Sequence, residues 1–227
     1  MLIESNLKKL NEQVFDKFIS ILDKFQNKEN IVIWLSWGSS ILWFYEILKT
    51  KANIIDKSIW QKIQFVFVDE RIVSLDHNDS NYKLNKDYLF DFLLENNYIK
   101  NSQIITIDLK AIDIVQNYFQ KVPYIDIWLF GVGPDGHTCS LFPWHKLNDM
   151  EGISFLEIKD SPKPPSNRIT LSKDYIATIP YIFIYFIWEG KKEAFQNFQN
   201  VDISKKNCPC KYALDSQNCI VVSDIKL

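Results

Sequence analysis

The sequence contains little of what marks several specialised classes of protein. Its 227 residues include four unevenly placed cysteines, too few for a disulfide framework in a chain of this length. The first residues lack the apolar core and cleavage site of a signal peptide. The longest wholly apolar run, residues 181–188, is too short to span a bilayer. We therefore expect reduced thiols, no membrane attachment and a cytoplasmic location.

An excess of charge of one sign is also missing. The formal net charge is −2 and the pI is near 5.9, so the charge balance favours neither nucleic acid nor an anionic membrane as a partner. Hydrophobic residues make up 47% of the chain, enough for a sizeable core. Because no repeat or low-complexity linker divides the chain, we expect a single domain over residues 1–227 that acts on a small molecule.

Apolar patterns of two kinds alternate along the chain. Patterns with the three- and four-residue steps of an amphipathic helix occupy residues 7–25, 41–48, 82–93 and 112–119. Mainly apolar runs of strand length occupy residues 31–35, 63–68, 104–107, 125–130, 181–187 and 220–222, and the first of these is apolar throughout. Runs without alternation are typical of parallel strands covered on both faces. The alternation predicts an α/β fold with a mainly parallel sheet.

The stretch from Leu129 to Pro143 is the richest in chemically useful residues. Between Gly131 and His137 it contains three glycines, a proline and Asp135, directly after an apolar run. Histidine titrates near neutral pH and serves as a general base, and a neighbouring carboxylate can orient it. A strand-to-helix turn whose glycines serve only backbone geometry would explain the same residues, so the turn alone leaves both interpretations open.

Polar residues also follow two other apolar runs. Asp69, Glu70 and Arg71 follow the run at 63–68, at the edge of a parallel sheet where ligands collect. The planar fork of Arg71 suits a phosphate group, and an ion pair with a neighbouring acid is the alternative. Residues 36–40 lead from the run at 31–35 into a helical pattern, where they can cradle a phosphate or simply cap the helix. Lys191 stands near the start of a later predicted helix, where a bound anion would relieve its conflict with the helix dipole; simple solvent exposure explains the same pattern equally well.

Five stretches together resemble the signature motifs of the 6-phosphogluconolactonase family. They read Gly-Val-Gly-Pro-Asp-Gly-His-Thr-Cys-Ser-Leu-Phe-Pro from residue 131, Val-Asp-Glu-Arg from 68, Asp-Ser-Asn-Tyr from 79, Arg-Ile-Thr-Leu from 168 and Glu-Gly-Lys-Lys from 189. The resemblance implies a Rossmann-like three-layer α/β sandwich, shared with sugar-phosphate isomerases and deaminases. It also implies hydrolysis of 6-phospho-D-glucono-1,5-lactone to 6-phospho-D-gluconate in the oxidative pentose phosphate pathway, without a metal or cofactor.

The same resemblance implies roles for the residues at matching positions. His137 would act as the general base on water, and Asp135 would tune or orient it. The substrate and its phosphate would be held by Gly38, Ser39, Ser40, Asp69, Arg71, Arg168 and Lys191. The family usually has Ser-Gly-Gly-Ser where this chain has Ser-Trp-Gly-Ser from residue 36, so Trp37 puts the phosphate grip of that loop in question.

Loop residues near these motifs have structural interpretations. His77 is expected to order the loop after Arg71, and Asp79 to cap the helix predicted at 82–93. The prolines within residues 160–165 oppose both helix and central strand, so a loop is expected ahead of Arg168. A solvated surface arginine is the alternative to a pocket position for Arg168.

Two other functions remain open. A non-catalytic sugar-phosphate binder, or an inactive relative, would be consistent with Trp37 and with the unusual carboxyl-terminal segment. An isomerase resembling glucosamine-6-phosphate deaminase would share the Asp-Gly-His turn, but residues 140–143 read Ser-Leu-Phe-Pro where that family has Phe-Asn-Glu-Pro. Cys208 and Cys210 invite a metal or redox interpretation, although no second Cys/His pair completes a zinc set. Because some relatives are fused to glucose-6-phosphate dehydrogenase, fusion or functional pairing with that enzyme is a possible partnership.

Overall fold

A parallel sheet forms the centre of the computed structural model, which describes residues 1–4, 7–35 and 39–226. Within these residues it has six strands in the order β1-β9-β8-β5-β2-β3, and each neighbouring pair is parallel. The strands are β1 (Leu2–Glu4), β2 (Ile31–Leu35), β3 (Ile63–Val66), β5 (Ile127–Gly131), β8 (Tyr181–Phe186) and β9 (Asn218–Ser223). The predicted α/β class with a mainly parallel sheet is confirmed.

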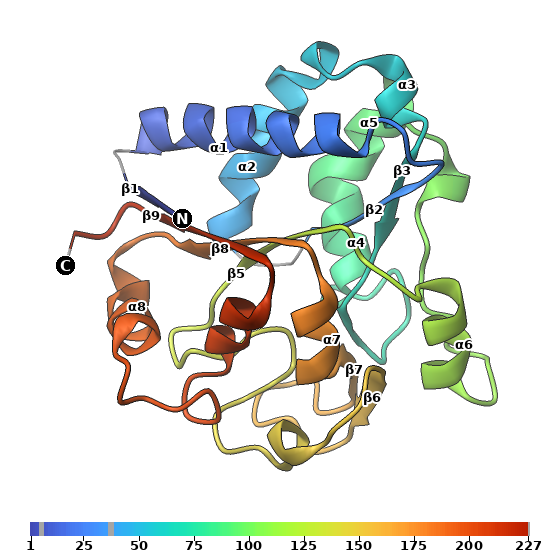
Figure 1. Ribbon diagram of the computed structural model, residues 1–227. Coiled ribbons are helices and arrows are strands. Elements are labelled where there is room, and N and C mark those ends of the chain that lie inside the picture. Colours follow the sequence, from blue (N-terminus) through green and yellow to red (C-terminus); the bar gives the residue numbers. More distant parts are fainter. Residues whose placement is uncertain (5–6, 36–38, 227) are drawn as a thin grey trace.

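Helices cover both faces of this sheet, which explains why its strands are continuous apolar runs. In Figure 1, α1 (Leu7–Leu22) and α2 (Ser39–Thr50) lie above the sheet, and α7 (Lys173–Thr178) and α8 (Lys192–Gln199) lie below it. Strand β5 is buried from Ile127 to Phe130, and Trp128 stands beside Trp34 of β2 in the parallel register. Apolar residues on both sides of a strand exclude water from both faces, as in other three-layer folds.

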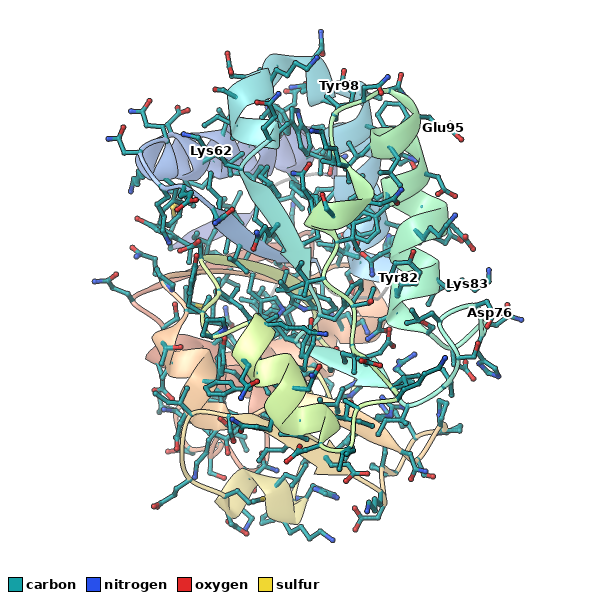
Figure 2. The ribbon with its side chains drawn as sticks, turned by 90° about the vertical axis from the view of Figure 1, so that its right-hand side faces the viewer. Lys62, Asp76, Tyr82, Lys83, Glu95 and Tyr98 are labelled. Atoms are coloured by element: carbon teal, nitrogen blue, oxygen red, sulfur yellow. The ribbon has the colours of Figure 1, made fainter. Side chains whose placement is uncertain are left out.

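The remaining helices lie on the right-hand side of the view in Figure 1, with α3 at the top. They are α3 (Lys57–Trp60), α4 (Asn81–Asn85), α5 (Asp91–Glu95) and α6 (Ile114–Lys121). A π-helical turn, Lys86–Phe90, joins α4 to α5. Figure 2 shows this joined helix from the side, with Tyr82 and Lys83 on α4, Glu95 on α5 and Asp76 in the preceding loop. The helix predicted at 82–93 is therefore present as one interrupted helix.

A second, smaller sheet was not predicted. Strands β4 (Asp69–Arg71), β7 (Arg168–Leu171) and β6 (Phe155–Ile158) pair antiparallel in the order β4-β7-β6. The strand predicted at 63–68 ends at Val66, because the chain then leaves the main sheet to pair with β7. A run of apolar residues indicates that a segment is buried. It does not show that the chain passes from one sheet to another within that segment.

Two further expectations about strands have opposite outcomes. The strand predicted at 104–107 is wrong: in the described residues it is reduced to a single bridge between Ile104 and Phe65. The strand predicted around residues 220–222 is confirmed as β9, which pairs with β1. The two ends of the chain therefore meet at one edge of the sheet (Figure 1).

Candidate active site

The turn after β5 is folded tightly around His137. The N–H of Gly133 donates to the carbonyl oxygen of His137 at 3.0 Å, and the N–H of Gly136 donates to the carbonyl oxygen of Gly133 at 2.9 Å. A Cβ atom on residue 133 would lie 1.9 Å from Nδ1 of His137, so only glycine fits beneath the ring. Gly136 has a φ of +79°, which glycine adopts without strain. The glycines thus let the imidazole lie directly over the backbone.

This turn is not the start of a helix. Thr138 and Leu141 form a bridge after it, and the next helical turn begins only at Lys146. The interpretation as a strand-to-helix turn is therefore wrong. The residues after His137 form a loop against the smaller sheet, where the N–H of Ser140 donates to Oγ1 of Thr170 on the central strand β7 at 3.2 Å.

Three side chains with complementary charges meet at this turn. Nδ1 of His137 hydrogen-bonds Oδ1 of Asp135, and Nζ of Lys163 lies 2.9 Å from Oδ2 of the same carboxylate. Nζ of Lys163 is also 3.2 Å from Nδ1 of His137. Because a carboxylate only accepts hydrogen bonds, Nδ1 carries the imidazole proton and Nε2 keeps its lone pair. The ring also contacts Phe142, with 4.8 Å between ring centroids.

Burial favours the neutral form of His137, whereas the neighbouring groups favour the ionised form of Asp135. Burial lowers the pKa of His137, and the ammonium of Lys163 adds to this effect, whereas Asp135 opposes it. Partial burial favours the protonated form of Asp135, but His137 and Lys163 hold its pKa well below the usual range. A neutral imidazole with an unprotonated Nε2 is the form that can accept a proton at neutral pH.

Sequence reasoning missed Lys163. It belongs to the proline-rich segment predicted as a loop, and 26 residues separate it from His137. The one signal available was a basic residue directly before the two prolines that precede Arg168.

Arg168 is buried and holds the loop that carries Lys163. Its Nε donates to the carbonyl oxygen of Pro165 at 2.9 Å, and its Nη2 donates to the carbonyl oxygens of Lys163 and Pro164 at 2.9 and 3.0 Å. The residue is 3% exposed, so the alternative of a solvated surface arginine is wrong. The Pro164–Pro165 bond that it holds is cis.

Arg71 lies beside Arg168 and retains unused donors. The two arginines face each other in the antiparallel register of β4 and β7. Nη1 of Arg71 donates to the carbonyl oxygen of Asp79 at 2.7 Å, while its buried Nε has no hydrogen-bond partner among the described residues. Within the described part of the chain, Arg71 makes no ion pair with Asp69 or Glu70. Two facing guanidinium groups repel each other unless an anion lies between them.

The acids of β4 have different partners from those expected. Both oxygens of Glu70 accept from the start of α4: Oε1 from the N–H of Asn81 at 2.7 Å, and Oε2 from the N–H of Tyr82 at 2.8 Å. The cap of α4 is Ser80, whose Oγ accepts from the N–H of Lys83 at 3.3 Å, so the prediction that Asp79 caps this helix is wrong.

The loop before α4 is ordered as expected. Nδ1 of His77 accepts from the N–H of Asp79 at 3.1 Å, which confirms the structural interpretation of His77.

Asp69 is buried at the edge of the site. Its carboxylate accepts from Oγ of Ser140 at 3.2 Å and from Nδ2 of Asn81 at 3.4 Å. Oγ of Ser140 also lies 3.4 Å from Nη1 of Arg168. Ser140 therefore connects Asp69 to Arg168, and these three residues form one buried polar group beside the turn.

Lys191 adds another positive charge on the same side. It ends the short helical turn Glu189–Lys191 that precedes α8, as the sequence predicted. Burial lowers the pKa of Lys191, and the nearby ammonium of Lys163 lowers it further, whereas Asp135 opposes the shift. Among the described residues, the ammonium of Lys191 has no hydrogen-bond or ion-pair partner. A partly buried ammonium that faces a second one favours an anion between them.

The remaining predicted phosphate ligands lie at the start of α2. Ser40 is buried there against the end of β5: a Cβ atom on Gly131 would lie 3.2 Å from Cβ of Ser40. Ser39 is the first residue of α2. The expectations for Gly38 and Trp37, and for the side chain of Ser39, lie outside the described residues.

The described residues also bear on the metal and membrane expectations. They contain no group of three or more His, Cys, Asp and Glu side chains that could hold a metal ion. They also contain no helix with the length and apolarity needed to cross a bilayer. Sγ of Cys208 and Sγ of Cys210 are buried and lie 3.4 Å apart, at hydrogen-bond distance and without a disulfide bond.

Comparison with known proteins gives consistent results. Residues 5–222 match the family model for glucosamine-6-phosphate isomerases/6-phosphogluconolactonase. The 6-phosphogluconolactonase of Rattus norvegicus is 34% identical over 176 residues, which cover 73% of this chain and 67% of that protein. The human 6-phosphogluconolactonase is 38% identical over 136 residues, covering 55% of this chain and 51% of that protein. A probable 6-phosphogluconolactonase 4 of Arabidopsis thaliana is 33% identical over 211 residues, with coverages of 82% and 78%.

Solved structures share the fold along almost the whole chain. The 6-phosphogluconolactonase of Leishmania guyanensis superposes with a TM-score of 0.79 at 22% identity, covering 98% of this chain and 96% of that one. A monomeric glucosamine-6-phosphate deaminase superposes with a TM-score of 0.77 at 18% identity, with coverages of 98% and 96%. The three-layer sandwich is therefore common to lactonases and a deaminase, so the fold alone does not distinguish the two activities.

Proposed function

The chain belongs to the glucosamine-6-phosphate isomerase/6-phosphogluconolactonase family, and on this premise we propose that it hydrolyses 6-phospho-D-glucono-1,5-lactone to 6-phospho-D-gluconate, a step of the oxidative pentose phosphate pathway. Relatives named 6-phosphogluconolactonase that are more than 30% identical support this activity. The observation that carries the proposal is the contact of His137 with Asp135 and Lys163, which leaves Nε2 of His137 as a free base.

In the proposed reaction, His137 activates water. Nε2 accepts a proton as the water oxygen attacks the lactone carbonyl carbon, and Asp135 stabilises the imidazolium that forms. The bond between that carbon and the ring oxygen then breaks, and the imidazolium returns its proton to the departing oxygen. A lactone is an activated ester, so one proton carrier is sufficient for both steps.

We further propose that cationic side chains hold the phosphate and fix the reacting carbon. Arg71 and Lys191 are suited to this role because each has donors that no described residue uses. Ser39, Ser40 and Gly38 would contribute at the start of α2, where helix N–H groups favour an anion. Asp69 and Arg168 would shape the pocket from the buried side.

The negative charge that develops on the carbonyl oxygen needs a separate donor. The N–H groups of Gly133 and Gly136 already donate within the turn, so we do not assign them to the oxyanion. The ammonium of Lys163, beside His137, is the candidate that we propose instead.

We also propose that residues 1–227 form one domain, that it acts in the cytoplasm, and that it works with glucose-6-phosphate dehydrogenase, whose product is the lactone. Pairing of β1 with β9 and a single hydrophobic core support the first point. Free thiols at all four cysteines support a reducing compartment. The plant relatives include one named as chloroplastic, so the compartment differs among relatives.

The test is the initial rate of ring opening of freshly generated 6-phosphoglucono-1,5-lactone, measured for the wild type, His137→Ala and a blank without enzyme. Loss of a general base typically costs about a hundredfold to ten-thousandfold in rate. We expect His137→Ala to fall in this range while its melting temperature stays close to that of the wild type. A wild-type rate equal to the blank, together with binding of 6-phosphogluconate, would instead identify a non-catalytic binder. Release of ammonia from glucosamine 6-phosphate would identify a deaminase.

A further inference from the structure

Two buried thiols lie directly beneath the turn that holds His137. Cys208 and Cys210 are 1% and 0% exposed, and their Sγ atoms are 3.4 Å apart. A Cβ atom on Gly136 would lie 2.8 Å from Sγ of Cys208, so the thiol fills the space that the glycine leaves. The N–H of Cys210 donates to the carbonyl oxygen of Gly136 at 2.9 Å. Both cysteines therefore contact the residue between Asp135 and His137.

The two thiols of this pair differ in acidity. The hydrogen bond from Cys210 lowers the pKa of the Cys208 thiol, against the effect of burial, and the ammonium of Lys211 also lowers it. Burial and the neighbouring sulfur raise the pKa of Cys210, so the two thiols differ in acidity. When two neighbouring thiols differ in acidity, the more acidic one ionises and is oxidised first, and the other resolves it. The other two cysteines, Cys139 and Cys219, both have raised pKa values because they are buried.

We propose that Cys208 and Cys210 are an oxidation site at which a peroxide forms a disulfide and thereby alters the turn that holds His137. The Cys208 thiolate attacks one oxygen of hydrogen peroxide, the O–O bond breaks, and the leaving hydroxide takes a proton to become water. Cys208 is then a sulfenic acid. The sulfur of Cys210 attacks the Cys208 sulfur, the S–O bond breaks, and the leaving hydroxide takes the Cys210 proton as a second water. Two thiols lose two electrons, and the peroxide gains them.

Closing this bond must move atoms that contact the active-site turn. The sulfurs are 3.4 Å apart and a disulfide bond is about 2.0 Å long, so their separation shrinks by more than 1 Å. Cys208 supports Gly136 through its sulfur and Cys210 through its backbone N–H. A displacement of about 1 Å in a catalytic group can cost about a hundredfold in rate. The regulatory part of this inference rests on the proposed lactonase activity, whereas the oxidation itself does not.

The oxidation can be measured without any activity assay. Cleavage after lysine yields a peptide of residues 207–211, Asn-Cys-Pro-Cys-Lys, which contains both thiols and neither of the other cysteines. The intact protein is treated with graded hydrogen peroxide, its free thiols are blocked with iodoacetamide under denaturing conditions, and it is then cleaved. We expect the peptide to lose two hydrogen atoms and to carry no blocking group. In Cys210→Ser, the same treatment should leave Cys208 as a sulfenic acid that dimedone traps.

Cys219→Ser is the matched control and should form the disulfide as readily as the wild type. Blocking groups on both Cys208 and Cys210 at peroxide concentrations that oxidise Cys219 would overturn the proposal.

The link to the active site is tested by hydrogen exchange of residues 131–143 before and after oxidation, and by the rate of lactone opening on the same samples. We expect oxidation to change exchange in the turn and to lower kcat/KM about tenfold or more, with both changes reversed by dithiothreitol. If the reduced protein does not open the lactone, the proposed function fails, but the peptide and exchange measurements still test this site. A disulfide that leaves both exchange and rate unchanged would overturn the coupling.

Discussion

The imidazole of His137 lies so close to Gly133 that a Cβ atom at residue 133 would be 1.9 Å from its Nδ1 and 2.6 Å from Oδ1 of Asp135. The contact between the ring and the carboxylate therefore depends on the missing side chain. Adding a side chain at residue 133 therefore tests whether this geometry matters for activity, without changing the catalytic groups themselves.

Gly133→Ala should displace His137 and Asp135 together. We expect kcat/KM for the lactone to fall about tenfold to a hundredfold, because a misplaced catalytic group loses most of its effect. The free energy of unfolding should change by no more than about 1–2 kcal/mol, since the affected side chains can swing outward. Gly190→Ala is the matched control, because an added Cβ there meets nothing within 4 Å. Equal rates for the two variants would mean that the position of the ring is not critical.

Lys163→Met should change the pH dependence of the reaction. Lys163 helps to lower the pKa of His137, and a base with a lowered pKa stays active until the pH falls through that value. Removing the ammonium leaves burial opposed by Asp135 and Asp69, so the pKa of His137 should rise and the acidic limb of kcat/KM should move to higher pH. Lys159→Met serves as the control, because its side chain is 74% exposed and, within the described residues, forms an ion pair only with Glu157. If the acidic limb does not move in Lys163→Met, Lys163 does not lower the pKa of His137.

The main sheet could be predicted because its strands are buried on both faces. Runs such as Ile31–Leu35 then contain no polar residue. Such a run can be recognised as a buried strand from its apolar composition alone. Strand β4 could not be predicted in the same way. Asp69–Arg71 is polar, and its partner β7 comes about a hundred residues later, so only the folded chain shows the antiparallel pairing.

Residues of the candidate site that belong to a recognisable local motif could be proposed from the sequence, whereas Lys163, which belongs to none, was missed. Asp135 and His137 are two residues apart, so a local motif contains them both. Lys163 reaches them only because buried Arg168 holds three carbonyl oxygens of its loop. Glu70 is the opposite case. Its position after a strand suggests a charge at a ligand site, but in the structure its oxygens accept hydrogen bonds from the start of α4. Residue types alone do not show which hydrogen bonds a buried carboxylate makes.

Arg71→Ala should weaken binding of the phosphorylated lactone selectively. A hydrogen bond to a charged group contributes about 1.5–3 kcal/mol, so KM should rise about tenfold to a hundredfold. Unphosphorylated glucono-1,5-lactone should be much less affected, because it offers no anion to the guanidinium. Lys83→Ala, which removes an exposed lysine paired with Asp87 on α4, is the control for general charge effects. An equal rise in KM for the two substrates would show that Arg71 does not bind the phosphate.

Arg168→Lys should affect the reaction in a different way. A lysine cannot reproduce the fork of bonds to Lys163, Pro164 and Pro165, so the loop should loosen and the ammonium of Lys163 should leave the turn. We expect kcat to fall about tenfold for phosphorylated and unphosphorylated lactones alike, and the acidic limb of the pH profile to move as in Lys163→Met. The double variant Arg168→Lys with Lys163→Met should then lose little more than either single variant, because both act through the same contact. Fully additive losses would indicate instead that Arg168 contacts the substrate directly, and the ratio of the two substrates' KM values would show whether it contacts the phosphate.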